Sequence, residues 1–268
     1  MRAVAAGLTD VGLQREHNED SFAVAEQHDL FVVADGMGGH QAGDVASRLA
    51  TKAFIDFFDT VLSEEVTWPF AFDPTLTEEE NRLLAGVRLG NRHINELSKS
   101  SIDHQGMGTT VVAALFSPRR GRLYVAHVGD SRAYRIRKGR IEQITRDHSL
   151  VNDYLAAMPE MSDEQRSELP KNVITRALGM QDQVQVDLGA FDAEPGDLYL
   201  LCSDGLSGML EDDELCEIAQ SDDDLEAACR NLIAGANEHG GEDNITAVLI
   251  RVEAVSPDEM RATLPDNH

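Results

Sequence analysis

The hydrophobic residues of this chain follow two alternating patterns, one typical of β-strands and one typical of helices. Short apolar runs bounded by glycine or polar turns predict strands over residues 3–9, 21–26, 30–35, 109–117, 122–128, 133–138, 184–190, 197–203 and 245–253. Several of these runs follow one another across short turns that contain Gly121 or Gly139. Turns this short cannot hold the crossover that parallel strands need, so we expect antiparallel pairing.

Longer segments that repeat a hydrophobic residue every three or four positions predict helices over residues 45–62, 78–100, 214–219 and 225–238. The helix over 78–100 follows Thr77, and Glu80 completes the spacing of a capping box. Its hydrophobic stripe also includes the polar Asn91. Because the strands come in runs with the helices grouped between them, the pattern predicts an α+β domain built in layers.

Two segments fit neither pattern. Residues 148–180 are polar, contain Pro159 and Pro170, and hold only a short helical piece over 162–169, so we expect an excursion across the surface. Residues 254–268 have the composition of a loose tail. The sequence therefore predicts a single domain over residues 1–253, followed by a C-terminal tail over 254–268.

The charge of the chain narrows the range of partners. Asp and Glu number 48 against 23 Lys and Arg, which gives a formal net charge of −25. A surface this acidic repels nucleic acid and anionic membranes, so neither is expected as a partner. No apolar run approaches the roughly 20 residues of a membrane span. The three cysteines are widely spaced and odd in number, which argues against a disulfide framework and indicates a reducing, cytoplasmic location.

Several acidic residues stand at the ends of predicted strands, and half of them are directly beside glycine. They are Glu19 and Asp20, Asp35, Asp130, Asp204 and Asp243. A single Asp-Gly pair is usually a turn, but this set could gather carboxylates at one end of a sheet. Unpaired carboxylates at close range repel one another, and hard divalent cations with oxygen ligands relieve that repulsion.

Two other phosphate-binding motifs fail on inspection. The loop from Gly38 to Gly43 has the glycine spacing of a P-loop, but Asp44 follows where lysine is required and would repel phosphate. Cys202 precedes a glycine-containing loop, as the nucleophile of a cysteine phosphatase would, yet Gly208 takes the place of the expected arginine. Cys202 is therefore interpreted as a buried strand residue.

The strand-end motifs resemble the metal-dependent protein phosphatases, the protein phosphatase 2C group, in its short bacterial form. The matching pieces occur in the family order and span residues 7 to about 252: Arg15–Ser21, Asp35–His40, Gly108–Thr110, Gly129–Ala133, Asp147–Leu150, Thr175–Gly179, Ser203–Leu206 and Asp243–Thr246. The resemblance implies a four-layer αββα sandwich, in which two antiparallel sheets stack and helices cover both outer faces. It also identifies residues 148–180 as the flap, a variable segment that touches substrates.

The resemblance implies a set of metal ligands. Asp35 would bridge two ions, Mn²⁺ or Mg²⁺, and the Gly36 carbonyl would ligate one of them. Asp204 and Asp243 would complete the other. Asp130, together with Asp204, would hold a third and weaker ion.

The resemblance also implies the catalytic roles. Glu19 and Asp20 would act directly or through bound waters, and a water held between the metals would attack phosphorus in line without a covalent intermediate. Arg15 would hold the phosphate oxygens through charge-assisted hydrogen bonds. Animal members carry histidine where this chain has Met37, which removes their candidate general acid. His40 is the bacterial-type alternative, and the competing interpretation is that His40 only caps or packs the following helix.

These inferences predict a monomeric cytoplasmic phosphatase of phosphoserine and phosphothreonine in proteins, which opposes a Ser/Thr kinase and acts on that kinase and its substrates. A variant of this hypothesis is a phosphatase that selects one signalling regulator by docking. A different class is a pseudo-phosphatase that binds phosphoproteins or kinases without turnover. The intact set of Asp35, Asp204 and Asp243 argues against the pseudo-phosphatase.

Overall fold

Two antiparallel sheets form the centre of the computed structural model, which describes residues 1–38, 42–61, 68–158, 160–161, 165, 169–170 and 173–255. One sheet has the strand order β1 (Arg2–Asp10), β11 (Ile245–Glu253), β10 (Leu198–Cys202), β7 (Arg132–Arg137) and β8 (Arg140–Gln143). The other has the order β2 (Asp20–Ala25), β3 (Leu30–Met37), β5 (Val111–Ser117), β6 (Arg122–Val128) and β9 (Asp187–Asp192), with the short β4 (Gly108–Thr109) paired to the end of β3.

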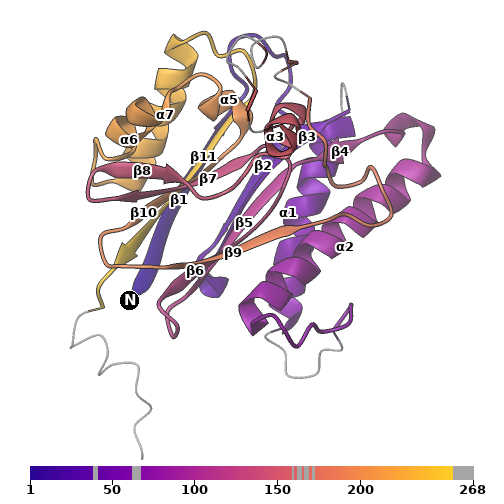
Figure 1. The fold of residues 1–268 in the computed structure, drawn as a ribbon, viewed down its shortest axis with the longest axis horizontal. Helices are drawn as coiled ribbons and strands as arrows, with labels where there is room; N and C mark the ends of the chain where they lie inside the picture. Colours follow the sequence, from indigo (N-terminus) through magenta and orange to yellow (C-terminus); the bar gives the residue numbers. More distant parts are fainter. Residues whose placement is uncertain are drawn as a thin grey trace, which may run out of the picture.

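Helices cover the outer face of each sheet (Figure 1). The long helices α1 (Ala42–Val61) and α2 (Glu78–Ser100) pack on the sheet that contains β3, β5 and β6. The helices α6 (Asp212–Ala219) and α7 (Leu225–Glu238), with the single turn α5 (Asp204–Ser207), pack on the sheet that contains β10 and β11. The α+β class and the four-layer αββα order predicted from the sequence are therefore confirmed. The described residues also form the short helical elements η1 (Glu26–His28), η2 (Ile102–His104) and α3 (Leu150–Ala157).

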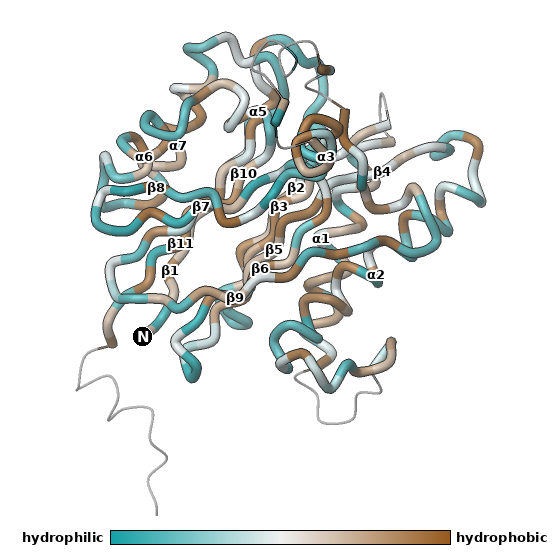
Figure 2. Tube along the Cα trace, in the orientation of Figure 1, coloured by the Kyte–Doolittle hydropathy of each residue, from teal (hydrophilic) through white to brown (hydrophobic). Residues whose placement is uncertain are grey.

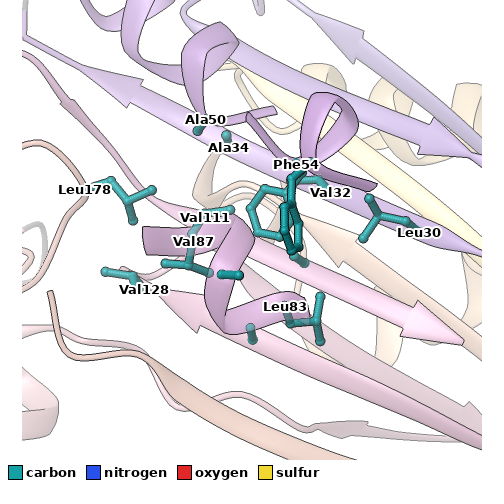
Figure 3. Packing of buried hydrophobic residues seen from close by; sticks show 14 of the residues in the cluster. Leu30, Val32, Ala34, Ala50, Phe54, Leu83, Val87, Val111, Val128 and Leu178 are labelled. Carbon is teal, nitrogen blue, oxygen red and sulfur yellow. The ribbon is translucent and has the colours of Figure 1, made fainter. Parts of the chain in front are cut away.

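Both faces of the central strands are buried, which explains their continuous apolar runs. In β3, Phe31 and Val33 face the sheet that contains β10 and β11, whereas the alternate residues face α1 and α2. Figure 2 shows the hydrophobic colour concentrated along β3, β5 and β6. In Figure 3, Phe54 of α1, Val87 of α2 and Val32 of β3 belong to one buried cluster, in which α1 packs against α2. Gly86 permits this close approach, because a Cβ there would lie within 2.5 Å of the Phe54 ring.

The predicted elements differ from the observed ones at a few places. The helix over 78–100 has its predicted bounds and its capping box of Thr77 and Glu80, but the strand predicted over 109–117 is broken at Thr110. The strand predicted from residue 184 begins only at Asp187, and β8, α3 and α5 were not predicted. The piece predicted over 162–169 and the tail beyond residue 255 lie almost entirely outside the described residues. No helix in the described part of the chain is long and apolar enough to cross a membrane.

Candidate active site

The strand ends that carry the predicted acids meet at one end of the two sheets. Asp20 stands directly opposite Asp35 in the β2–β3 pair, so the two side chains share a face of the sheet. Asp204 follows β10 and Asp243 precedes β11, and these two strands are also paired. A cavity of about 520 Å³ lies where they meet, and its lining includes Arg15, Glu19, Asp35, Gly36, Asp130, Asp204 and Asp243.

Asp20 is buried beside this lining, with 7% of its surface exposed. Its Oδ2 accepts hydrogen bonds from Ser203 Oγ at 2.8 Å and from Thr246 Oγ1 at 2.6 Å. Its Oδ1 is buried and has no hydrogen-bond partner among the described residues. Burial raises the pKa of Asp20 from 3.8 to about 7, against the two hydrogen bonds and with a further contribution from the charges of Asp204 and Asp243.

The other acids of the cavity share this environment. Burial is the largest cause that raises the pKa of Glu19, Asp35 and Asp204. For Asp35, the charges of Asp20 and Asp204 raise it further. Burial, followed by the charge of Asp204, raises the pKa of Asp130 to about 7. The buried carboxylates of this cluster are therefore unfavourable as free anions at neutral pH. Binding of protons or of a cation would stabilise them.

The donor set fits divalent metal ions. Asp204 Oδ1, like Asp20 Oδ1, is buried without a hydrogen-bond partner among the residues that the structure describes. The backbone at Gly36 is tightly enclosed, because a Cβ there would collide with the carbonyl oxygens of Gly43 and Glu19. Carboxylate and carbonyl oxygens are the ligands that Mg²⁺ and Mn²⁺ prefer. These residues can therefore hold the metals that the sequence predicted.

Arg15 lies on the rim of the cavity, where it pairs with one of the predicted ligands. Its Nη2 donates to Asp243 Oδ2 at 2.7 Å, and its side chain is 56% exposed. The loop that carries Arg15 is held by the buried Asn244, whose Nδ2 donates to the carbonyl oxygens of Val11 and His17. Asn244 Oδ1 in turn accepts from the backbone N–H of Glu19 at 2.8 Å. The sequence offered no local sign of this role, because every partner is more than 220 residues away.

Asp130 sits in a turn that is held by contacts with His148 and Thr110. Gly129 has φ +108°, and a Cβ there would press within 2.6 Å of the Thr110 side chain. His148 closes a two-way contact with this turn, because its backbone N–H donates to Gly129 O and its Nδ1 accepts from Gly129 N–H. Burial lowers the pKa of His148, which favours the neutral ring that this acceptor role requires. His148 O then accepts from Thr175 N–H at 2.8 Å, which joins the two ends of the segment over residues 148–175.

The general acid predicted from the sequence lies outside the described residues. His40 belongs to the stretch 39–41, which the structure does not describe. Met37, at the position where animal relatives carry histidine, does line the cavity. The assignment of His40 stays a prediction.

Comparisons with known proteins agree with this geometry. The sequence model of the family described as protein phosphatase 2C matches residues 14–249. The chain is 40% identical over 246 residues to the serine/threonine phosphatase stp of Listeria monocytogenes serotype 4b, which covers 90% of this chain and 93% of that protein. It is 36% identical over 247 residues to the protein phosphatase PhpP of Streptococcus pneumoniae, which covers 91% and 95%.

Solved structures give the same result. The serine/threonine phosphatase PstP/Ppp of Mycobacterium tuberculosis superposes with a TM-score of 0.81 at 36% identity and covers 95% of this chain and 100% of that one. The catalytic domain of PstP in complex with two manganese ions has a TM-score of 0.78 at 36% identity, with coverage of 94% and 99%. That protein carries two metal ions on a fold that closely matches the one in Figure 1.

Proposed function

This chain belongs to the protein phosphatase 2C family, and from that premise we propose how its residues carry out hydrolysis. It is a metal-dependent serine/threonine protein phosphatase, and its substrates are phosphorylated proteins. The alternative of a non-catalytic binding protein is not favoured, because the carboxylate set is complete. The observation that carries the proposal is the meeting of the strand-end acids at one cavity, where Asp20 Oδ1 and Asp204 Oδ1 are buried without a hydrogen-bond partner among the described residues.

Each acid of the cavity has a proposed part in holding metal. Asp35 and the Gly36 carbonyl, with Asp204 and Asp243, would hold two ions, either Mn²⁺ or Mg²⁺. Asp130 would hold a third, weaker ion together with Asp204, and Glu19 and Asp20 would contribute directly or through water. When bound, such ions activate water and neutralise charge on the phosphoryl group.

The remaining chemistry is supplied by side chains. Asp243 holds Arg15 at 2.7 Å on the cavity rim. If Asp243 serves as a ligand, its negative charge is shared, and the Arg15 guanidinium becomes available for phosphate oxygens. Arg15 is thereby placed to fix the phosphoryl group through charge-assisted hydrogen bonds. We assign to His40 the transfer of a proton to the serine or threonine oxygen as it leaves.

The wider setting follows from the same proposal. We place the catalytic domain over residues 1–253, with 148–180 as its flap and 254–268 as its tail. The enzyme would act as a cytoplasmic monomer that opposes a Ser/Thr kinase. The reducing location is supported by three free cysteines, Cys202, Cys216 and Cys229, which are all buried.

The test compares phosphoserine, phosphothreonine and phosphotyrosine versions of one peptide, each with Mn²⁺ and with chelator. We expect rapid phosphate release from the first two peptides with Mn²⁺ and slow release from phosphotyrosine. Equal rates on all three peptides would contradict a serine/threonine phosphatase, and binding of the phosphopeptides without release would restore the pseudo-phosphatase hypothesis.

A further inference from the structure

A second, smaller cavity opens beside the catalytic one. Its volume is about 320 Å³, and its lining includes Met37, Ile174, Ala177, Met180 and Val184. Met37 and Ile174 line both cavities, so the two cavities lie next to each other. A chain whose phosphorylated residue occupies the catalytic cavity would therefore pass this opening within a few residues, at about 3.3 Å per residue.

The second cavity differs in chemistry from the first. The catalytic lining is rich in carboxylates, whereas the described lining of the second cavity consists of aliphatic, thioether and uncharged polar side chains together with Arg176. The charge of Arg176 is already compensated, since its Nη1 donates to Asp187 Oδ1 at 3.0 Å. In a protein with a formal net charge of −25, this is an uncharged recess next to an acidic site.

One wall of the recess is held rigidly by α2. The buried Asn91 accepts from Gly179 N–H at 2.9 Å, and its Nδ2 donates to the backbone oxygen of Gln181 at 3.0 Å. Asn95, one turn further along, donates to Gly179 O at 2.9 Å. The backbones of Leu178 and Thr109 are also bonded to each other in both directions.

This clamp fixes the position of Met180. The Met180 side chain follows directly after the clamped Gly179 and is 58% exposed. Because Met180 also lines the recess, its exposed side chain offers an apolar surface to a group that enters the recess.

We infer that this recess is a subsite for an uncharged apolar side chain of the substrate, close in sequence to the phosphorylated residue. The inference rests on the proposed phosphatase function and adds a substrate preference to it. The charge of the two adjacent cavities favours this occupant. A carboxylate in the recess would be repelled by Glu16 and Glu19, which line the neighbouring catalytic cavity, whereas an apolar side chain would cover Met180 and Val184.

The experiment uses a set of phosphothreonine peptides that carry either leucine or aspartate at each of three positions on both sides of the phosphothreonine. The full chain is assayed with Mn²⁺, and the ratio of kcat/KM for the leucine and aspartate peptides is taken at each position. We expect a ratio of about ten or more at one position, which is a typical discrimination for one apolar group in a pocket. In Met180→Lys the ratio at that position should fall below one, because the new ammonium favours aspartate there.

Phe72→Ser is the matched control, because Phe72 is an exposed apolar residue that lines neither described cavity. It should keep the wild-type ratio at every position. The inference is overturned if no position prefers leucine, or if Met180→Lys keeps the wild-type ratio at the preferred position. Should Met180→Lys fail to fold, Val184→Lys provides the same reversal at another lining residue of the recess. Hydrolysis of nitrophenyl phosphate by the wild-type enzyme distinguishes a failure of the proposed function from a failure of the subsite. No hydrolysis would contradict the phosphatase function itself. Hydrolysis without a leucine preference would contradict the subsite alone.

Discussion

Replacement of Asp20 by asparagine should stabilise the metal-free protein at pH 8. The carboxylate is buried, and its pKa of about 7 instead of 3.8 means that its ionisation costs the folded state up to about 4 kcal/mol above pH 7. An asparagine Oδ1 can keep the hydrogen bonds from Ser203 and Thr246, and its amide group would face the acidic cluster in place of the unpartnered oxygen. We therefore expect Asp20→Asn to gain about 2–4 kcal/mol of unfolding free energy at pH 8 in chelator.

The sign of the pH dependence follows from the raised pKa. Between pH 4 and pH 7 the folded wild type binds a proton on Asp20 that the unfolded chain has released. The contribution of Asp20 to the unfolding free energy therefore falls as the pH rises through about 7. The advantage of Asp20→Asn should thus shrink as the pH falls from 8 to 5. Mn²⁺ should reduce the advantage of Asp20→Asn, because it should stabilise more strongly the protein that keeps the carboxylate.

Urea unfolding at pH 8 and pH 5, with chelator and with Mn²⁺, measures these differences. Asp103→Asn is the control, because it removes the same charge from an exposed residue. The reasoning is refuted if Asp20→Asn is less stable than wild type at pH 8 in chelator, or if its advantage does not change with pH.

Three further variants test individual residues. Arg15→Ala should lower kcat/KM for phosphopeptides by the equivalent of about 1.5–3 kcal/mol with little change in stability, because Arg15 is largely exposed; unchanged kinetics would make it a surface residue. Asp130→Ala should leave two tight metal sites in titration calorimetry but lower turnover at limiting Mn²⁺, and loss of a tight site would contradict its assignment. His40→Ala should slow phosphopeptide hydrolysis far more than nitrophenyl phosphate hydrolysis, since nitrophenolate leaves without a proton; equal losses would favour a structural role.

The fold was largely predictable because its strands are buried on both faces. The runs over 30–35, 122–128 and 245–253 are mostly apolar, and each corresponds to a strand. The missed β8 is a short edge strand in which only Ile141 is apolar, so no alternation marks it. The break at Thr110 also has no local signal, because Thr110 N–H still donates to Asp35 O, in register with the pairs that β3 makes with β4 and β5.

The candidate site was predictable to the extent that its acids stand at strand ends. That position alone was enough to suggest that Asp35, Asp204 and Asp243 would meet, and they line one cavity. The residues that hold them were not predictable. Ser203 and Thr246 fix Asp20 from 183 and 226 residues away, and only the folded chain shows such contacts.

The dependence of hydrolysis on metal tests the central claim most directly. Protein stripped with chelator is titrated with Mn²⁺ while phosphate release from a phosphothreonine peptide is measured, for the wild type, Asp35→Asn and Asp204→Asn, with circular dichroism to verify the fold of each. The account predicts no release without metal, a rise with Mn²⁺ for the wild type, and no turnover by either folded variant. Full activity of the stripped wild type, or normal turnover by a variant, would contradict it.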